Sequence, residues 1–137
     1  MTGVQTCALP ICAEIIDGEV PGTVDDFGTS LDASGQVWAG TGNPDTSIHS
    51  RKGLADGKWH HVAFTRKEST GALTLFIDGV QVSVGHGGSQ RLTSAPGLRA
   101  GVLQSGRNFL AGSVADIAVY SAALPPATVT AHFHARQ

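Results

Sequence analysis

The sequence contains little charge. Only 15% of its 137 residues are Asp, Glu, Lys or Arg, well below the usual quarter. The nine Lys and Arg residues are scattered and the net charge is −2, so the sequence lacks the basic block of a nucleic-acid-binding surface or of a polybasic membrane anchor. It also lacks an apolar run close to the roughly 20 residues that a membrane-spanning helix needs. We therefore expect neither nucleic-acid binding nor a membrane span.

Cysteine is almost absent as well. The two cysteines, Cys7 and Cys12, lie in the first twelve residues, which read MTGVQTCALPIC. This stretch has no basic segment and Pro10 interrupts its apolar part, so it is a poor signal peptide. MTGVQTCALPI resembles the translation of a common sequencing adapter. We expect residues 1–12 to be a non-native leader, with a genuine but unusual leader as the alternative, and we assign the cysteines no disulfide, metal or redox role.

The rest of the sequence is rich in glycine and in short apolar segments. Its 41% hydrophobic content excludes a charge-rich disordered chain, and its composition excludes a coiled coil. Turn residues separate the apolar segments and no long helical period interleaves them, which predicts an all-β fold: an antiparallel two-sheet sandwich of the jelly-roll type. The predicted strands cover 13–20, 27–31, 36–40, 46–50, 59–65, 72–77, 80–84, 98–103 and part of 109–121, and a short C-terminal helix covers 127–135.

Three blocks in the same order resemble the laminin-G-like domains of the concanavalin A-like lectin and glucanase fold. Asp56–Ala63, DGKWHHVA, is similar to the family signature DGxWHHVA. Leu73–Val82, LTLFIDGVQV, and Phe109–Leu124, FLAGSVADIAVYSAAL, are similar to a hairpin and a later strand of the family. The resemblance implies a jelly-roll sandwich that begins with two or three further strands. Because these are not found before Ala13, we expect residues 13–137 to be such a domain, incomplete at its N-terminus.

The signature segment contains three large side chains. The resemblance implies that Trp59 is a buried packing residue. His60 and His61 are adjacent on a predicted strand and therefore face opposite ways, so we do not expect them to bind one metal ion. We expect one of them to pack or to form a hydrogen bond and the other to face solvent. Asp78-Gly79 is a preferred pair for a type I′ hairpin turn, which explains Asp78 by itself.

One acidic cluster can be compared with the catalytic motif of related enzymes. Glu14, Asp17 and Glu19 form E-x-x-D-x-E, whereas related laminarinase-type enzymes use E-x-D-x-x-E on one strand. The spacing is reversed, and without a bulge Glu14 falls on the face opposite to Asp17 and Glu19. Retaining hydrolysis needs two carboxyl groups about 5–5.5 Å apart. We therefore expect no catalytic residues and no enzyme activity, and interpret the segment as an edge strand with solvated charges.

Two loops and one tryptophan carry the candidate binding sites. Some members of this fold hold calcium in rim loops, so the resemblance makes Asp25, Asp26, Asn43 and Asp45 candidate calcium ligands. The alternative is that these residues serve their turns. Trp38 is flanked by polar loops and is a candidate platform for a sugar ring, together with Asn43 and Asp45. The alternative for Trp38 is a core or partly buried position in a sheet.

The resemblance implies a non-catalytic carbohydrate-binding or adhesion module. It is similar to modules attached to secreted bacterial glycoside hydrolases and surface proteins. The expected partners are a glycan or an extracellular polysaccharide and the other domains of a parent chain, and the expected location is secreted or at the cell surface. The alternatives are a structural spacer without its own ligand and a remnant of a glucanase.

Overall fold

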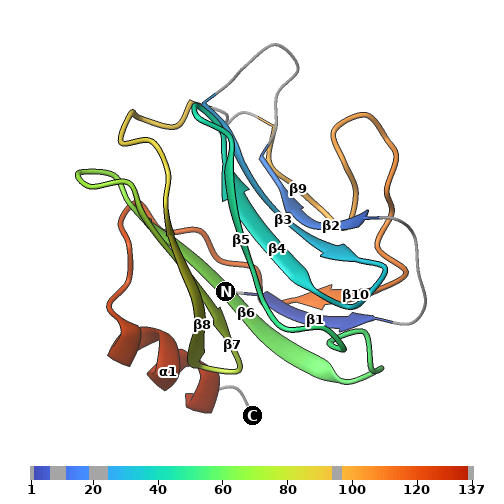
Figure 1. Ribbon diagram of the computed structural model, residues 1–137. Helices are drawn as coiled ribbons and strands as arrows, with labels where there is room; N and C mark the ends of the chain where they lie inside the picture. The colour runs from blue at the N-terminus through green and yellow to red at the C-terminus, as the bar shows by residue number, and fades with distance from the viewer. Residues whose placement is uncertain (1, 7–11, 19–24, 94–96, 136–137) are drawn as a thin grey trace.

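The computed structural model describes residues 2–6, 12–18, 25–93 and 97–135, which form two antiparallel five-stranded sheets (Figure 1). The first sheet has the order β10 (Gly112–Ala115), β1 (Thr2–Thr6), β6 (Trp59–Lys67), β7 (Ala72–Ile77), β8 (Val80–His86). The second sheet has the order β5 (Thr46–His49), β4 (Val37–Thr41), β3 (Phe27–Asp32), β2 (Cys12–Asp17), β9 (Arg99–Ala100). One short helix, α1 (Pro126–Ala135), follows. The predicted all-β sandwich with a short C-terminal helix is confirmed.

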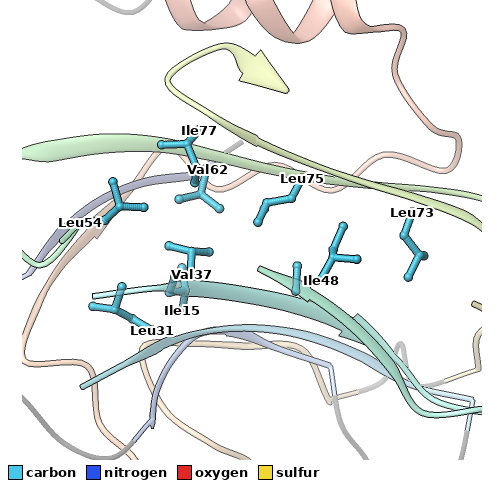
Figure 2. Packing of buried hydrophobic residues seen from close by; sticks show 10 residues of the cluster. Ile15, Leu31, Val37, Ile48, Leu54, Val62, Leu73, Leu75 and Ile77 are labelled. Atoms are coloured by element: carbon cyan, nitrogen blue, oxygen red, sulfur yellow. The ribbon is translucent and has the colours of Figure 1, made fainter. Parts of the chain in front are cut away.

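The core fills the space between the sheets (Figure 2). On β2, β3 and β4 every second residue points inward, as the two-residue period of a strand requires. The inward positions carry mostly aliphatic side chains, whose burial supplies the main stabilising free energy. The buried members of this core are Ile15, Leu31, Val37, Ala39, Ile48, Leu54, Val62, Leu73, Leu75 and Ile77.

Strand β1 lies within the twelve residues that the sequence predicts to be a non-native leader. It pairs with β6 on one side and with β10 on the other, and so completes the first sheet. The interpretation of residues 1–12 concerns their origin and stays a prediction, as does the N-terminal incompleteness of residues 13–137. No helix in the described ranges has the length and apolar composition that a membrane span requires.

The β7–β8 hairpin has the turn that its sequence predicts. Asp78 and Gly79 have φ values of 52° and 76°, as a type I′ turn requires. The turn is not the whole explanation of Asp78, however. Its Oδ1 accepts a hydrogen bond from the backbone N–H of His61 at 2.9 Å, and its Oδ2 lies 2.8 Å from Nδ1 of His60. Helix α1 packs on the same turn, where the Thr130 hydroxyl donates to the Gly79 carbonyl at 2.8 Å.

The structure overturns two expectations for the signature segment. Trp59 is 43% exposed, because it is the first residue of β6 and lies at an end of the sheet. Neither histidine faces solvent freely. The ring of His60 is held between Asp78 and Asp56, with its Nε2 3.1 Å from Asp56 Oδ1 and only 12% of its side chain exposed. His61 lies on the opposite face of the strand and is buried. Its ring lies 5.9 Å from that of Phe133.

The acidic β2 segment is not a solvated edge strand. β2 lies between β3 and β9 and Asp17 is fully buried, where its carboxylate accepts a hydrogen bond from the backbone N–H of Gln104. The β2–β3 register shifts between Glu14 and Ile16, yet Glu14 still lies on the outer face while Asp17 points inward. Glu19 lies outside the described residues.

Candidate functional site

A groove of about 270 Å³ lies on the outer face of the second sheet. This volume is just below the range of about 300–1,000 Å³ that small-molecule pockets occupy. Strands β2 to β5 and the ends of their loops supply the residues that line it: Glu14, Asp26, Phe27, Gly28, Ser30, Trp38, Ala39, Gly40, Thr41, Gly42, Asp45, Thr46 and Ser47.

Small residues form the floor of the groove. Gly28 of β3 lies opposite Gly40 of β4, and Gly40 lies opposite Ser47 of β5. Their neighbours Ala39 and Ile48 are buried in the core, so this row faces outward. Because glycine has no side chain, two adjacent glycines leave the surface of the sheet uncovered. The hollow therefore follows from the alignment of the two glycines across β3 and β4.

The next row of the sheet forms one wall. Here Glu14, Ser30 and Trp38 lie side by side on β2, β3 and β4 and line the groove, and His49 of β5 continues the row outside the lining. Trp38 is half-buried and faces outward, since the residues on either side of it point into the core. The structure therefore does not place Trp38 in the core between the sheets. It places the indole beside the glycine floor.

Two contacts hold the Trp38 ring in place. Its Nε1–H donates to Oδ2 of Asp32 at 2.9 Å, and its ring centroid lies 4.5 Å from that of His49. The other carboxylate oxygen of Asp32 accepts hydrogen bonds from the backbone N–H groups of Ser34 and Gln36 at 2.8 and 3.0 Å. Asp32 thus joins the aromatic wall to the β3–β4 turn. A ring fixed in this way loses little conformational entropy when a ligand stacks on it.

Acid should release Trp38 from this anchor. Burial raises the pKa of Asp32, but hydrogen bonds from Trp38, Ser34 and Gln36 outweigh it and lower the pKa from 3.8 to about 2. A carboxylate with a lowered pKa stabilises the folded state above about pH 4, and this contribution is lost as the pH falls towards 2. In a Trp59→Phe background, we expect the emission of Trp38 to change as the pH falls from about 4 through 2.

The matched control for this prediction is Asp32→Asn in the same Trp59→Phe background. Its amide does not titrate, so its emission should be constant over the same range. Circular dichroism reports whether the sandwich stays folded at each pH. Constant emission in the parent protein, with the fold intact, would contradict the anchoring role of Asp32.

The loops before β3 and β5 form an acidic rim. Asp26 and Asp45 both line the groove, whereas Asn43 and Asp25 lie outside its lining and pair with each other, with Asn43 Nδ2 donating to Asp25 Oδ1 at 3.0 Å. Burial raises the pKa of Asp26, and repulsion from Asp45, Asp17 and Asp25 raises it further, against a lowering backbone hydrogen bond. Of the predicted ligand-binding residues, the structure thus brings Trp38 and Asp45 to one groove, and Asn43 is not among the lining residues.

Calcium binding by the rim residues stays a prediction. The predicted ligands are Asp25, Asp26, Asn43 and Asp45. Over the described ranges, no three His, Cys, Asp or Glu side chains gather closely enough to hold a metal ion. One oxygen of Asp25 is already engaged by the Asn43 amide. We therefore derive no step of binding from calcium.

Several lining residues were not assigned a binding role from the sequence. Gly28 and Gly40 occupy outward positions of adjacent strands, and Glu14 and Ser30 extend the row of Trp38 across the sheet. The alternation of each strand indicates which residues face outward. It does not give the pairing between strands, on which the groove depends. A glycine at an outward position of each of two consecutive predicted strands was the available signal.

Comparison with solved structures supports the fold. A Bacteroides ovatus protein assigned provisionally to carbohydrate binding has a TM-score of 0.75 and 17% identity, over 94% of this chain and 38% of its own. The Ruminococcus gnavus IT-sialidase CBM40, also solved with α2,3- and α2,6-sialyllactose, has a TM-score of 0.74 and 14% identity, over 96% and 79%. Domains LG4-5 of the mouse laminin α1 chain have a TM-score of 0.57 and 19% identity, over 82% and 32%.

The chain therefore spans 38% of the length of the Bacteroides protein. No curated protein sequence matches it. A family model, Laminin_G_3, described as the concanavalin A-like lectin/glucanases superfamily, matches residues 14–130. This match covers most of the sequence and includes all three blocks that carried the resemblance. The chain belongs to the Laminin_G_3 family of the concanavalin A-like lectin/glucanases superfamily.

Proposed function

We propose that this domain is a non-catalytic carbohydrate-binding module and that a sugar ring lies in the groove against Trp38. The observation that carries the proposal is the fixed indole beside a floor of two glycines. The apolar C–H face of a pyranose can pack on an aromatic ring, and a floor without side chains allows the sugar to approach the sheet. A few placed polar groups beside an apolar wall are typical of small-ligand sites.

The polar lining matches the hydroxyl groups of a sugar. Ser30 and Ser47 lie on the outer face of the sheet and can donate or accept hydrogen bonds. The carboxylates of Asp26 and Asp45 accept hydrogen bonds at the rim. Charged acceptors make stronger hydrogen bonds to hydroxyls than neutral ones do. We assign the orientation of the sugar to these groups and the stacking to Trp38.

The position of the acidic residues favours binding over hydrolysis. Glu14 lines the groove, whereas Asp17 is fully buried on the opposite face of β2. These two residues therefore do not form the pair of carboxylates that flanks a scissile bond in glycoside hydrolases. A structural spacer would require neither the groove nor the anchored indole, so these two features favour a binding module over a spacer.

The proposal also covers the location of the domain and the protein to which it belongs. We propose a secreted or cell-surface location and a larger bacterial parent protein, such as a glycoside hydrolase, whose other domains are partners of this one. The relatives with carbohydrate-binding names and the partial coverage of the Bacteroides protein support this. Calcium is proposed only as a separate ligand of the rim residues Asp25, Asp26, Asn43 and Asp45. Titrations with added calcium and with EDTA separate it from glycan binding.

Replacing Trp38 with alanine tests the proposed function, and the exposed Trp59 of the other sheet provides the matched control. Isothermal titration with a panel of oligosaccharides of glucose, galactose, N-acetylglucosamine and glucosamine should identify a ligand of the unchanged protein. We expect Trp38→Ala to weaken that ligand roughly tenfold through lost stacking, and Trp59→Ala to leave the affinity unchanged. If the folded protein binds no member of the panel, or if both variants bind equally well, the proposal is wrong.

A further inference from the structure

The groove carries charge of one sign. Glu14 of β2 lines it beside the Trp38 row, and Asp26 and Asp45 line it at the rim. Among the described lining residues there is no Lys, Arg or His; His49 contacts the Trp38 ring from β5 but lies outside the lining. At neutral pH the ionised carboxylates therefore act on any ligand in the groove without a compensating cation in the lining.

Two arginines of the described chain donate to backbone carbonyls outside the groove. Arg66 donates from Nε and Nη2 to the Gly88 carbonyl at 3.2 and 2.7 Å. Arg99, on the neighbouring strand β9, donates to the Gly97 carbonyl at 3.2 Å. These two guanidinium groups are therefore bound to backbone carbonyls and not to the carboxylates of the groove.

The rim is also crowded with negative charge. Burial and the nearby carboxylates of Asp45 and Asp25 raise the pKa of Asp26. A cation placed at the rim would relieve this repulsion, whereas an anion would add to it. The π face of an indole attracts cations as well. The acidic rim and the indole of Trp38 thus both favour a positively charged ligand.

We propose that the groove prefers a cationic sugar, one that carries a free 2-amino group, over a neutral sugar, and that it excludes acidic sugars. The inference rests on the proposed function, because it assumes that a glycan occupies the groove. It also separates this domain from the CBM40 relative solved with sialyllactose, a sugar that carries a carboxylate. The three lining carboxylates would repel that group.

Two pairs of ligands test the proposal, because each pair differs mainly in charge. The first is the tetrasaccharide of glucosamine against that of N-acetylglucosamine. The second is sialyllactose against lactose. Titrations at about pH 5.5, where the sugar amine and most carboxylates are charged, should show the glucosamine tetramer binding roughly tenfold more tightly than its acetylated form at low salt. The difference should shrink towards twofold at about 0.5 M NaCl, because the groove is open to screening ions.

Substitutions test whether the lining carboxylates cause the preference for the cationic sugar. Replacing all three lining carboxylates, Glu14→Gln with Asp26→Asn and Asp45→Asn, should bring the two affinities close to each other. Asp116→Asn is the matched control, since Asp116 is exposed, follows β10 of the other sheet and has a φ of 54°, which asparagine tolerates. This control should keep the full preference. Thermal melts of all variants should confirm that they are folded.

The outcomes separate the two proposals. Equal affinity for the glucosamine and N-acetylglucosamine tetramers, tighter binding of sialyllactose than of lactose, or a preference that survives undiminished in the triple variant would each overturn the charge proposal and leave the glycan groove standing. If the folded protein binds none of these sugars nor any other member of the panel, the proposed function fails and the charge proposal fails with it.

Discussion

A valine in place of Gly28 is expected to abolish binding of every glycan that the groove accepts, while the domain becomes slightly more stable. A Cβ at Gly28 would lie 3.5 Å from the Ile16 carbonyl and 4.0 Å from Oε2 of Glu14, which are ordinary contact distances. The larger side chain then extends outward from the floor into the space of the ligand. A β-branched residue in a strand interior also removes the entropic cost of glycine, about 0.5–1 kcal/mol.

The two readouts for Gly28 move in opposite directions, which makes the result hard to explain by misfolding. Thermal melting gives stability and isothermal titration gives affinity. Gly28→Ala is the graded control and should weaken binding only in part, because its methyl group fills less of the floor. Gly40 cannot serve in this role, since a Cβ there would lie 2.8 Å from the Thr46 carbonyl. If Gly28→Val binds as well as the unchanged protein, the ligand does not lie on this floor.

Leu75→Ala should destabilise the domain more than any surface change. Leu75 is fully buried on β7 and lies in the layer between the two sheets (Figure 2). Removing its branched end loses buried apolar surface and leaves a cavity that the rigid sheets fill only partly. Such substitutions cost about 2–5 kcal/mol. Urea unfolding followed by circular dichroism should show a lower midpoint with an unchanged slope.

Val84→Ala provides the comparison for Leu75→Ala. Val84 lies on the neighbouring strand β8 but is 62% exposed, so its side chain loses little on truncation. We expect a change within about 0.5 kcal/mol, as for most surface substitutions. Equal destabilisation by the two variants would contradict the assignment of the core to the inner faces of the sheets.

Local pattern predicted the hairpin strands well. The boundaries of β7 agree with the predicted 72–77, because an alternating apolar strand ends directly at the type I′ pair Asp78-Gly79. The prediction for 98–103 was too long, since only Arg99–Ala100 is a strand and Gly101 follows with a φ of 73°. Segment 109–121 contributes only Gly112–Ala115, and Val119 beyond it is 63% exposed. The alternation of apolar and polar residues gave segment 109–121 a strand-like pattern. Whether a segment pairs in a sheet depends on neighbours that are distant in sequence.

The candidate site was predicted in part for the same reason. The position of Trp38 in its strand and the polar character of its loops indicated an aromatic platform. The groove itself depends on the register that aligns Gly28 with Gly40, and on the Asp32 bond that fixes the ring. Neither follows from the period of one strand. Trp59 was misjudged as buried because the family signature does not tell how far a strand end extends into solvent.

The bond between Trp38 and Asp32 links the proposed stacking wall to the β3–β4 loop. The Asp32 carboxylate is fixed by backbone groups of the four-residue segment 33–36, so the length of that loop determines where the indole stands. During divergence, an insertion in this loop would change the position of the Trp38 ring and leave the core unchanged. Homologues could thus acquire new glycan preferences through changes in the β3–β4 loop alone.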